Sequence, residues 1–201
     1  MKFDMADKEH LNMIITGHID NGKSTTMGHF LMDLGVVDER TIAAHAKESE
    51  ETGKGDTFKY AWVMDNIKDE RARGITIDLA FKKFETPKYF FTLIDAPGHR
   101  DFVKNMITGA SEADCAVLVL SAKEGETDTA VAPGGQAREH AFLLKTLGVS
   151  QIILAINKMD DSKYSEDAYK AAKDKGEKLV KSVGYKVENV PAIPVSGWTG
   201  E

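Results

Sequence analysis

The chain has 201 residues, of which 42% are hydrophobic and 29% are charged, and its formal net charge is −6. This size suits one α/β domain, or two small ones at most, and the composition excludes disorder and collagen-like repeats. The longest apolar runs, such as residues 115–120, are far shorter than the roughly 18 residues of a membrane span, so no membrane partner is expected. The acidic balance disfavours a generally basic nucleic-acid surface.

Cysteine usage and the first residues predict a cytoplasmic location. Cys115 is the single cysteine, so no internal disulfide can form and a reducing compartment is favoured. The chain starts MKFDMADKEH, which mixes acidic and basic side chains and lacks the apolar run of a signal peptide.

Apolar runs of strand length alternate with segments of helical period, which predicts a mostly parallel sheet with helices on both faces. The expected strands are 11–16, 77–85, 89–94, 115–120, 152–156 and 190–195, and the expected helices are 23–34, 101–111, 135–147 and 165–183. The second and third strands must be antiparallel, because the three residues between them are too few for a parallel crossover. Two prolines predict that the last strand lies at an edge.

One stretch is too long for a simple βαβ unit, which takes roughly 30 residues. The surplus lies at residues 38–73, which carry nine acidic and seven basic side chains together with Phe58, Tyr60 and Trp62. We therefore expect an insertion that is partly helical and partly packed. Long insertions in a compact domain are more often functional than idle.

Residues 17–24 read GHIDNGKS and match G-x-x-x-x-G-K-[ST] between an expected strand and an expected helix. Loop N–H groups and the positive end of the helix dipole suit phosphates. Lys23 is expected to place its charge on the outer phosphates and Ser24 its hydroxyl on Mg²⁺. The position between strand and helix disfavours a chance turn. The nucleotide-binding residues expected here are Gly17, His18, Ile19, Asp20, Asn21, Gly22, Lys23, Ser24 and Thr25.

Residues 157–160 read NKMD and also follow an apolar strand. Asp160 can accept from N1–H and N2–H₂ of guanine, a donor pair that adenine lacks. Asn157 can bond N7 and tether neighbouring loops, and the Lys158 stem can lie over the base. A helix cap is the ordinary alternative for such an Asp, and a turn for the last expected contacts, which are Ser196, Gly197 and Trp198.

Four further residues point to hydrolysis. Asp95 and Gly98 belong to the DAPG that ends a strand, where the carboxylate would hold Mg²⁺ through water and the Gly98 N–H would reach a γ-phosphate. Thr76 can complete the Mg²⁺ shell, and His99 stands where other families orient the attacking water. The expected catalytic residues are therefore His99, Lys23 and Thr76, and the expected metal ligands are Ser24, Thr76 and Asp95. His10, His29, His45 and His140 are interpreted as surface or helix-face residues, and His18 lies inside the loop at 17–24.

The ordered motifs GHIDNGKS, GITI, DAPGH, NKMD and SGW resemble those of the translational GTPases, and most closely the archaeal and eukaryotic elongation factor 1-alpha family. The resemblance extends over the whole chain and rests on long strings at 55–78, 95–121 and 134–148. It implies a P-loop NTPase fold, GTP, GDP and Mg²⁺ as ligands, and slow hydrolysis that the ribosome stimulates. It also implies aminoacyl-tRNA, the ribosome and a guanine-nucleotide exchange factor as partners of the full factor.

The resemblance implies roles for single residues as well. His99 would position water, Ile19 and Ile75 would form an apolar gate around it, and Asp20 would help to hold a monovalent cation. Asn21 departs from the family, which usually has His or Ser there. Residues 1–201 are expected to form the GTP-binding domain, with a switch insertion at about 38–77 and without the two β-barrel domains that follow in the family.

Four alternatives stay open at this stage. The chain could be the GTPase domain of a related termination or ribosome-rescue factor, or the GTPase subunit of sulfate activation. It could also be a nucleotide-binding module that no longer hydrolyses, which the retained His99, Thr76 and Ser24 disfavour. A P-loop kinase or ATPase is the fourth alternative, and Asp160 is the residue that discriminates against it.

Overall fold

The computed structural model describes residues 8–53, 58–64, 70–71 and 75–201. Its elements, in chain order, are β1 (Glu9–Gly17), α1 (Lys23–Asp33), α2 (Glu39–Glu51), α3 (Ala61–Met64), β2 (Ala80–Glu85), β3 (Tyr89–Asp95), η3 (Arg100–Phe102), α5 (Val103–Ser111), β4 (Cys115–Ser121), α6 (Glu126–Val131), α7 (Gln136–Thr146), β5 (Gln151–Asn157), α8 (Glu166–Val183), η4 (Val187–Asn189) and β6 (Ala192–Pro194). Within this part of the chain, no helix is long and apolar enough to cross a membrane.

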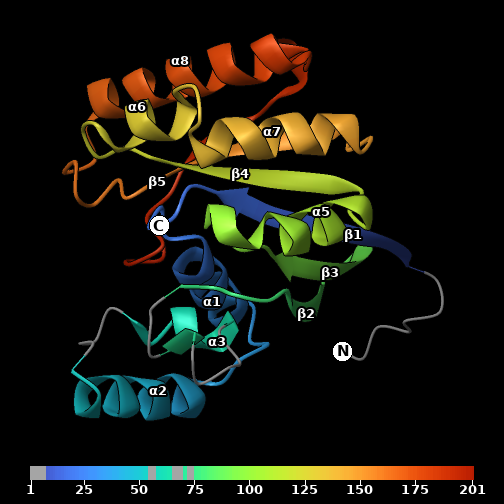
Figure 1. Ribbon diagram of the computed structural model, residues 1–201. Coiled ribbons are helices and arrows are strands. Elements are labelled where there is room, and N and C mark those ends of the chain that lie inside the picture. Colours follow the sequence, from blue (N-terminus) through green and yellow to red (C-terminus); the bar gives the residue numbers. More distant parts are fainter. Residues whose placement is uncertain (1–7, 54–57, 65–69, 72–74) are drawn as a thin grey trace.

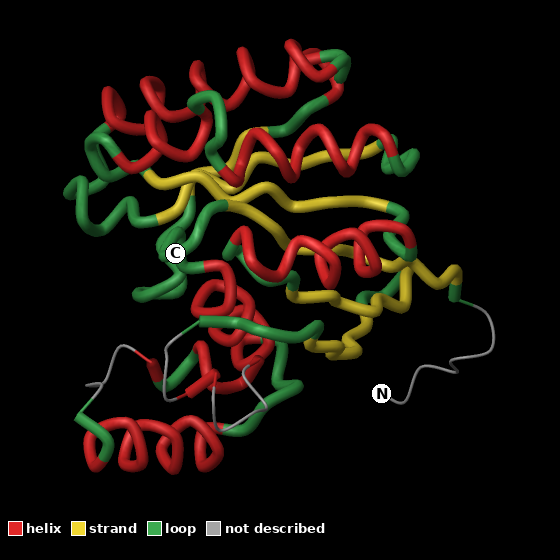
Figure 2. The backbone as a smooth tube through the Cα atoms, in the orientation of Figure 1, coloured by secondary structure: helices red, strands yellow, loops and turns green. Residues whose placement is uncertain are grey.

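A six-stranded sheet with the order β2-β3-β1-β4-β5-β6 forms the centre (Figures 1 and 2). All neighbouring strands are parallel except β2, which runs antiparallel to β3. The predicted fold class is therefore confirmed, including its one antiparallel strand. Because parallel strands end at the same edge, the sheet brings together the last residues of four strands, which are Gly17, Asp95, Ser121 and Asn157.

Helices cover both faces of the sheet, with α1, α2 and α3 on one side and α6, α7 and α8 on the other (Figure 1). On the α7 side, Ile14 belongs to a buried cluster with Leu144 and Leu179. On the α1 side, the neighbouring Ile15 belongs to a second cluster with Leu31. Successive residues of a central strand thus point into two different cores, which explains why the strand sequences are apolar throughout.

Most expected elements lie where the pattern places them. The expected helices 23–34 and 135–147 correspond to α1, which is shorter by one residue at its C-terminal end, and to α7, which is shorter by one residue at each end. In α8, the Ser165 hydroxyl caps the first turn by accepting from the Ala168 N–H at 3.3 Å. The last strand lies at the sheet edge, as predicted, although only Ala192–Pro194 pair as β6.

The predicted start of the second strand is wrong. Pairing with β3 begins at Ala80 rather than at Ile77. The N–H groups of Ile77 and Asp78 donate instead to the Glu70 carboxylate, at 3.0 and 3.1 Å. Those donors are therefore unavailable to the sheet, and the strand starts only after them.

The described part of the insertion is helical and packed, as expected. Trp62 in α3 is only 2% exposed, and the Arg71 guanidinium lies 5.2 Å from its ring centre while bonding Glu48. A Cβ at Gly28 of α1 would lie 1.9 Å from the Tyr60 carbonyl oxygen, so α3 can approach α1 this closely only over a glycine. The expected insertion also includes residues 54–57, 65–69 and 72–74, which lie outside the described residues.

His140 of α7 is fully buried, which corrects its interpretation as a surface or helix-face residue. Its Nδ1 lies 2.7 Å from Thr16 Oγ1 in a hydrogen bond that joins α7 to β1. Burial, and then the positive charges of Lys23 and His18, lower the pKa of His140 from 6.5 to about 3. The imidazole therefore stays neutral in the folded protein at every ordinary pH.

The depressed pKa predicts an acid sensitivity that His140→Gln removes. Below pH 6.5 the unfolded chain binds a proton at His140 that the native chain does not, so stability is full above that pH and is lost as the pH falls. From about pH 7.5 to about pH 5, the free energy of unfolding should fall by about 2 kcal/mol more in the unmodified protein than in the variant. Urea unfolding at several pH values measures the difference, and parallel pH curves would contradict the assignment.

Candidate functional site

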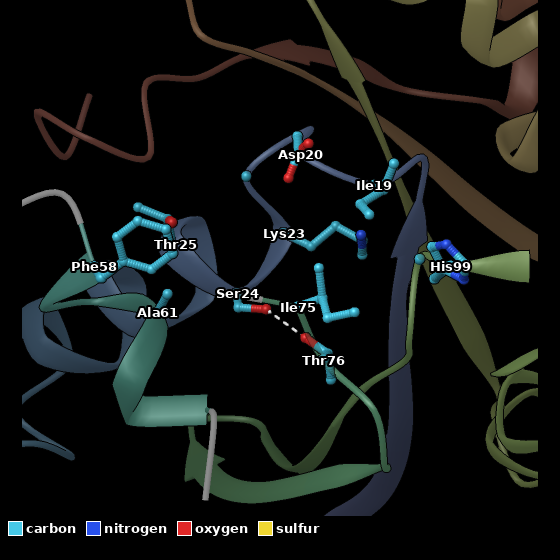
Figure 3. Close-up of a pocket in the computed structure, with 12 residues that line it drawn as sticks. Ile19, Asp20, Lys23, Ser24, Thr25, Phe58, Ala61, Ile75, Thr76 and His99 are labelled. Carbon is cyan, nitrogen blue, oxygen red and sulfur yellow. Dashed lines mark hydrogen bonds between the residues drawn. The ribbon is translucent and has the colours of Figure 1, made fainter. Parts of the chain in front are cut away.

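Two adjacent cavities lie at the edge of the sheet where β1, β3 and β5 end. The first measures about 290 Å³ and is lined by Ile19, Asp20, Gly22, Lys23, Ser24, Thr25, Phe58, Ala61, Ile75, Thr76, Gly98 and His99 (Figure 3). The second measures about 380 Å³ and is lined by Asp20, Gly22, Thr25, Asn157, Lys158, Asp160, Asp161, Gly197 and Trp198. Asp20 and Gly22 of the loop after β1 and Thr25 of α1 line both cavities, so the two cavities together form one elongated site.

The loop between β1 and α1 has the backbone that its glycines allow. Gly17 and Gly22 have φ values of 146° and 79°, and a Cβ at Gly17 would lie 2.4 Å from the Val119 carbonyl oxygen. Lys23 is 7% exposed, and its Nζ donates to the His18 carbonyl at 3.0 Å. A Cβ at Gly98 would lie 2.4 Å from this Nζ and 3.1 Å from the Gly17 carbonyl oxygen, so the segment after β3 packs closely on the lysine and on the loop after β1.

Two side chains of the loop face away from these cavities, which the motif did not indicate. His18 lines a separate cavity beside α6, where burial and then the charge of Lys23 lower its pKa. Asn21 is 1% exposed, and its Nδ2 donates to the Val119 carbonyl at 2.9 Å. Both residues therefore offer the site only their backbone, and Asn21 fits its position through a bond to β4.

Three oxygen-bearing side chains meet beside Lys23, those of Ser24, Thr76 and Asp95. Ser24 Oγ donates to Asp95 Oδ2 at 2.7 Å. The same Oγ lies 3.1 Å from Thr76 Oγ1 (Figure 3). Asp95 is fully buried, and its Oδ1 has no hydrogen-bond partner among the described residues. Burial raises the pKa of Asp95 to about 6, although the charge of Lys23 and the bond from Ser24 act against the rise.

This group suits a hard cation. Mg²⁺ prefers hydroxyl, carboxylate and water oxygens, and it commonly reaches a protein carboxylate through water. A buried carboxylate oxygen without a partner costs free energy that such a cation and its water relieve. The unpaired Oδ1 of Asp95 therefore agrees with the prediction that Ser24, Thr76 and Asp95 are the magnesium ligands.

His99 lies in the same cavity as the two expected gate residues, Ile19 and Ile75 (Figure 3). Its Nδ1 accepts from the Asp101 N–H at 3.2 Å and lies 3.4 Å from the Asp101 carboxylate. These contacts orient the ring from outside the cavity. The structure thus brings together three residues that are far apart in the sequence.

Asn157 connects the two loops that line the second cavity. Its side chain is 3% exposed; Nδ2 donates to the Asn21 carbonyl at 2.8 Å, and Oδ1 accepts from the Gly197 N–H at 2.9 Å. A Cβ at Gly22 would lie 2.5 Å from the same Nδ2, so the loop between β1 and α1 packs closely against the Asn157 amide. Asn157 therefore tethers the loops, as the sequence led us to expect.

The far end of the second cavity carries a carboxylate. Asp160 Oδ1 accepts from the Ser196 hydroxyl at 2.6 Å, and Asp160 lines the cavity. Lys158 has a φ of 62°, and its Nζ donates to Glu126 Oε2 at 2.7 Å. Partial burial of Glu126 acts against the shift, but bonds from Lys158 and Ser121 lower the pKa of this carboxyl.

Sequence reasoning missed some residues of the site. Glu126 orients Lys158 but belongs to no motif, and only its place shortly after an apolar strand could have indicated it. Phe58 and Ala61 line the first cavity from the insertion, and Asp161 lines the second. The aromatic residues of the insertion were noted in the sequence, but their direction depends on how α3 packs against α1.

The family model described as "Elongation factor Tu GTP binding domain" matches residues 8–201. The chain belongs to this family. A match over nearly the whole chain confirms the resemblance that the motifs indicated.

Curated relatives agree with the family model. An elongation factor 1-alpha of Cenarchaeum symbiosum (strain A) is 86% identical over 201 residues, which are 100% of this chain and 46% of that protein. One from Thermofilum pendens is 58% identical over 193 residues, which cover 96% of this chain and 44% of that protein. The chain thus spans less than half the length of these relatives.

Solved structures show the same fold. A structure of sup35 complexed with GDP is 34% identical with a TM-score of 0.69, and the match covers 98% of this chain and 40% of that one. The Ski7 GTPase-like domain of S. cerevisiae, bound to GDP and inorganic phosphate, has a TM-score of 0.81 at 23% identity, and the match covers 96% of this chain and 44% of that one.

The tether predicts that Asn157→Ala is strongly destabilising. The change removes two buried hydrogen bonds and leaves the Gly197 N–H buried without its acceptor, so the free energy of unfolding should fall by about 2–4 kcal/mol. Asn12→Ala is the matched control, because its amide makes an exposed bond to the Glu112 carbonyl and should cost under about 1 kcal/mol. Denaturant unfolding compares the two, and equal losses would contradict the role of Asn157.

Proposed function

We propose that this chain is the GTP-binding and GTP-hydrolysing switch domain of an elongation factor that delivers aminoacyl-tRNA to the ribosome. One observation carries the proposal. The first cavity, which the hydroxyl side chains of Ser24 and Thr76 line, shares Asp20, Gly22 and Thr25 with the second cavity, which Asp160 lines. Two adjoining cavities, with phosphate-binding groups in the first and the Asp160 carboxylate in the second, suit a nucleoside triphosphate whose base is guanine.

Guanine is selected by hydrogen bonds that adenine cannot reproduce. With Ser196 bonded to one oxygen, the Asp160 carboxylate keeps acceptor capacity for guanine N1–H and N2–H₂. In the same loop, the Ser196 N–H donates to the Glu201 carbonyl and the Gly197 N–H to Asn157, so the Trp198 N–H is the donor for O6. A base lacking this pattern leaves these groups unpaired, which is costly.

The phosphates occupy the first cavity. Lys23 and the N–H groups of the loop bind them, and the Gly98 N–H meets the γ-phosphate. Ser24, Thr76 and, through water, Asp95 would hold Mg²⁺, which would neutralise charge on the outer phosphates. Asp20 lines both cavities and adds a carboxylate that helps to hold a monovalent cation.

Hydrolysis depends on the water beside His99. The imidazole orients that water toward the γ-phosphate, and Ile19 and Ile75 restrict its access until a partner moves them. Intrinsic hydrolysis is then slow and the ribosome stimulates it. Residues 38–77 act as the switch, because Thr76 closes on the ion only while the γ-phosphate is present.

The partners belong to the longer protein. Ribosome, aminoacyl-tRNA and a guanine-nucleotide exchange factor are the partners we propose for it, and the cytoplasm is their compartment. Relatives up to 86% identical carry the name elongation factor 1-alpha, which supports elongation over termination, ribosome rescue or sulfate activation.

Nucleotide affinities test the proposal. GDP and GTP should bind at least about 100-fold more tightly than ATP, and Mg²⁺ should strengthen GTP binding. Asp160→Asn should weaken GTP and favour a xanthine nucleotide, because the amide donates where the carboxylate accepts. Titration calorimetry with and without Mg²⁺ measures all of these. ATP binding as tight as GTP binding would establish the kinase or ATPase alternative instead.

His99→Ala separates binding from hydrolysis. GTP affinity should change by less than about threefold, whereas single-turnover hydrolysis, alone and with ribosomes, should fall about 10²- to 10⁴-fold. His10→Ala is the matched control, because His10 lies at the opposite end of β1 and its ring bonds Thr92 of β3. Loss of affinity in parallel with hydrolysis would refute the role of His99.

A further inference from the structure

His29, in α1, is buried between the loop at 196–200 and the insertion. Its Nδ1 donates to the Gly197 carbonyl at 3.0 Å, and only 7% of the residue is exposed. A Cβ at Gly200 would lie 2.6 Å from His29 Nε2, so the loop also packs on the edge of the ring. One side chain of α1 thereby fixes the loop whose residues Gly197 and Trp198 line the second cavity, the proposed base cavity.

The face of the same ring carries the insertion. Tyr60 stacks on His29 with 4.1 Å between ring centres and 12° between ring planes. Gly28 makes this possible, because any Cβ there would collide with the Tyr60 carbonyl. The imidazole is thus bonded to the loop at its edge and stacked on the insertion at its face.

A second contact joins the same two segments directly. The rings of Tyr60 and Trp198 meet edge to face, with centres 6.2 Å apart. Lys59 Nζ lies 5.1 Å from the Trp198 ring centre and 5.2 Å from that of Tyr60. Trp198 lines the base cavity. Phe58 and Ala61, which flank Lys59 and Tyr60 in the sequence, line the first cavity beside Thr25 (Figure 3).

We propose that His29, Tyr60 and Trp198 form an aromatic link that couples the base cavity to the insertion. His29 and Tyr60 are positioning residues: neither is among the residues that line the first or the second cavity, but together they hold Trp198 and the residue 58–61 segment in a fixed relation. Occupancy of the base cavity then steadies residues 58–64, and a steadied 58–64 segment slows release of the base. Coupling of this kind acts in both directions by the same factor.

The link rests on the proposed function only in that the ligand is a guanine nucleotide. Its simplest competitor is that Tyr60 merely fills the core of the insertion. The two differ in what happens at residues 196–200 when Tyr60 changes: the link predicts loosening of that loop, whereas core filling predicts an effect confined to the insertion.

Tyr60→Leu tests the link, because it removes the stack and keeps an apolar side chain. GDP dissociation, followed with a fluorescent analogue, should accelerate about five- to tenfold, the factor that corresponds to one aromatic pair. Tyr60→Phe keeps the ring and should return the rate close to that of the unmodified protein. Phe30→Leu is the matched control, because Phe30 is the next residue of α1 and its ring meets Phe84 of β2, 5.3 Å away, instead of the loop. Its GDP dissociation should be unchanged.

Amide hydrogen exchange in the nucleotide-free protein provides the second readout. Tyr60→Leu should speed exchange at 196–200, and Trp198→Leu should speed exchange at 58–64. Thermal unfolding confirms that each variant is folded. An unchanged dissociation rate or unchanged exchange at 196–200 in folded Tyr60→Leu would overturn the link. If the unmodified protein binds no guanine nucleotide, the proposed function fails, and the exchange measurement alone then decides the link.

Discussion

The side-chain amide of Asn157 is the interaction on which the site depends. It donates to the loop after β1 and accepts from the loop after β6, while the backbone carbonyl of the same residue accepts from the Ala122 N–H at 2.7 Å. An amide offers a donor and an acceptor on one rigid group, which neither a carboxylate nor an apolar side chain does. The relative position of the phosphate and base cavities is therefore set by one residue at the end of β5.

Helix α1 extends this control to the insertion. Its first turn presents Ser24 to Asp95 and Thr76, and its second presents His29 to the loop at 196–200 and to Tyr60. One rigid helix thus contacts both ends of the nucleotide site. The buried Asp95 carboxylate, with one oxygen unpaired, leaves an electrostatic cost at the phosphate end that a cation relieves.

Much of this arrangement could be predicted from sequence, because motifs that follow parallel strands must meet at one edge of the sheet. Lys23, Asp95 and Asp160 were assigned in this way. Tertiary contacts decided the rest: Glu70 takes the donors that would have started β2 earlier, and Glu126 reaches Lys158 from an element without a motif. The direction of the Asn21 side chain, which points away from the cavities and bonds β4, depends on backbone angles that residue types alone do not determine.

The central claim is that Asn157 holds the two loops together before a nucleotide binds. Amide hydrogen exchange of Gly197, followed by NMR in the nucleotide-free protein, tests it most directly. The account predicts a slowly exchanging Gly197 N–H that GDP slows only slightly further, and rapid exchange in Asn157→Ala. Protection that arises only after GDP is added would show that the nucleotide, and not Asn157, assembles the site.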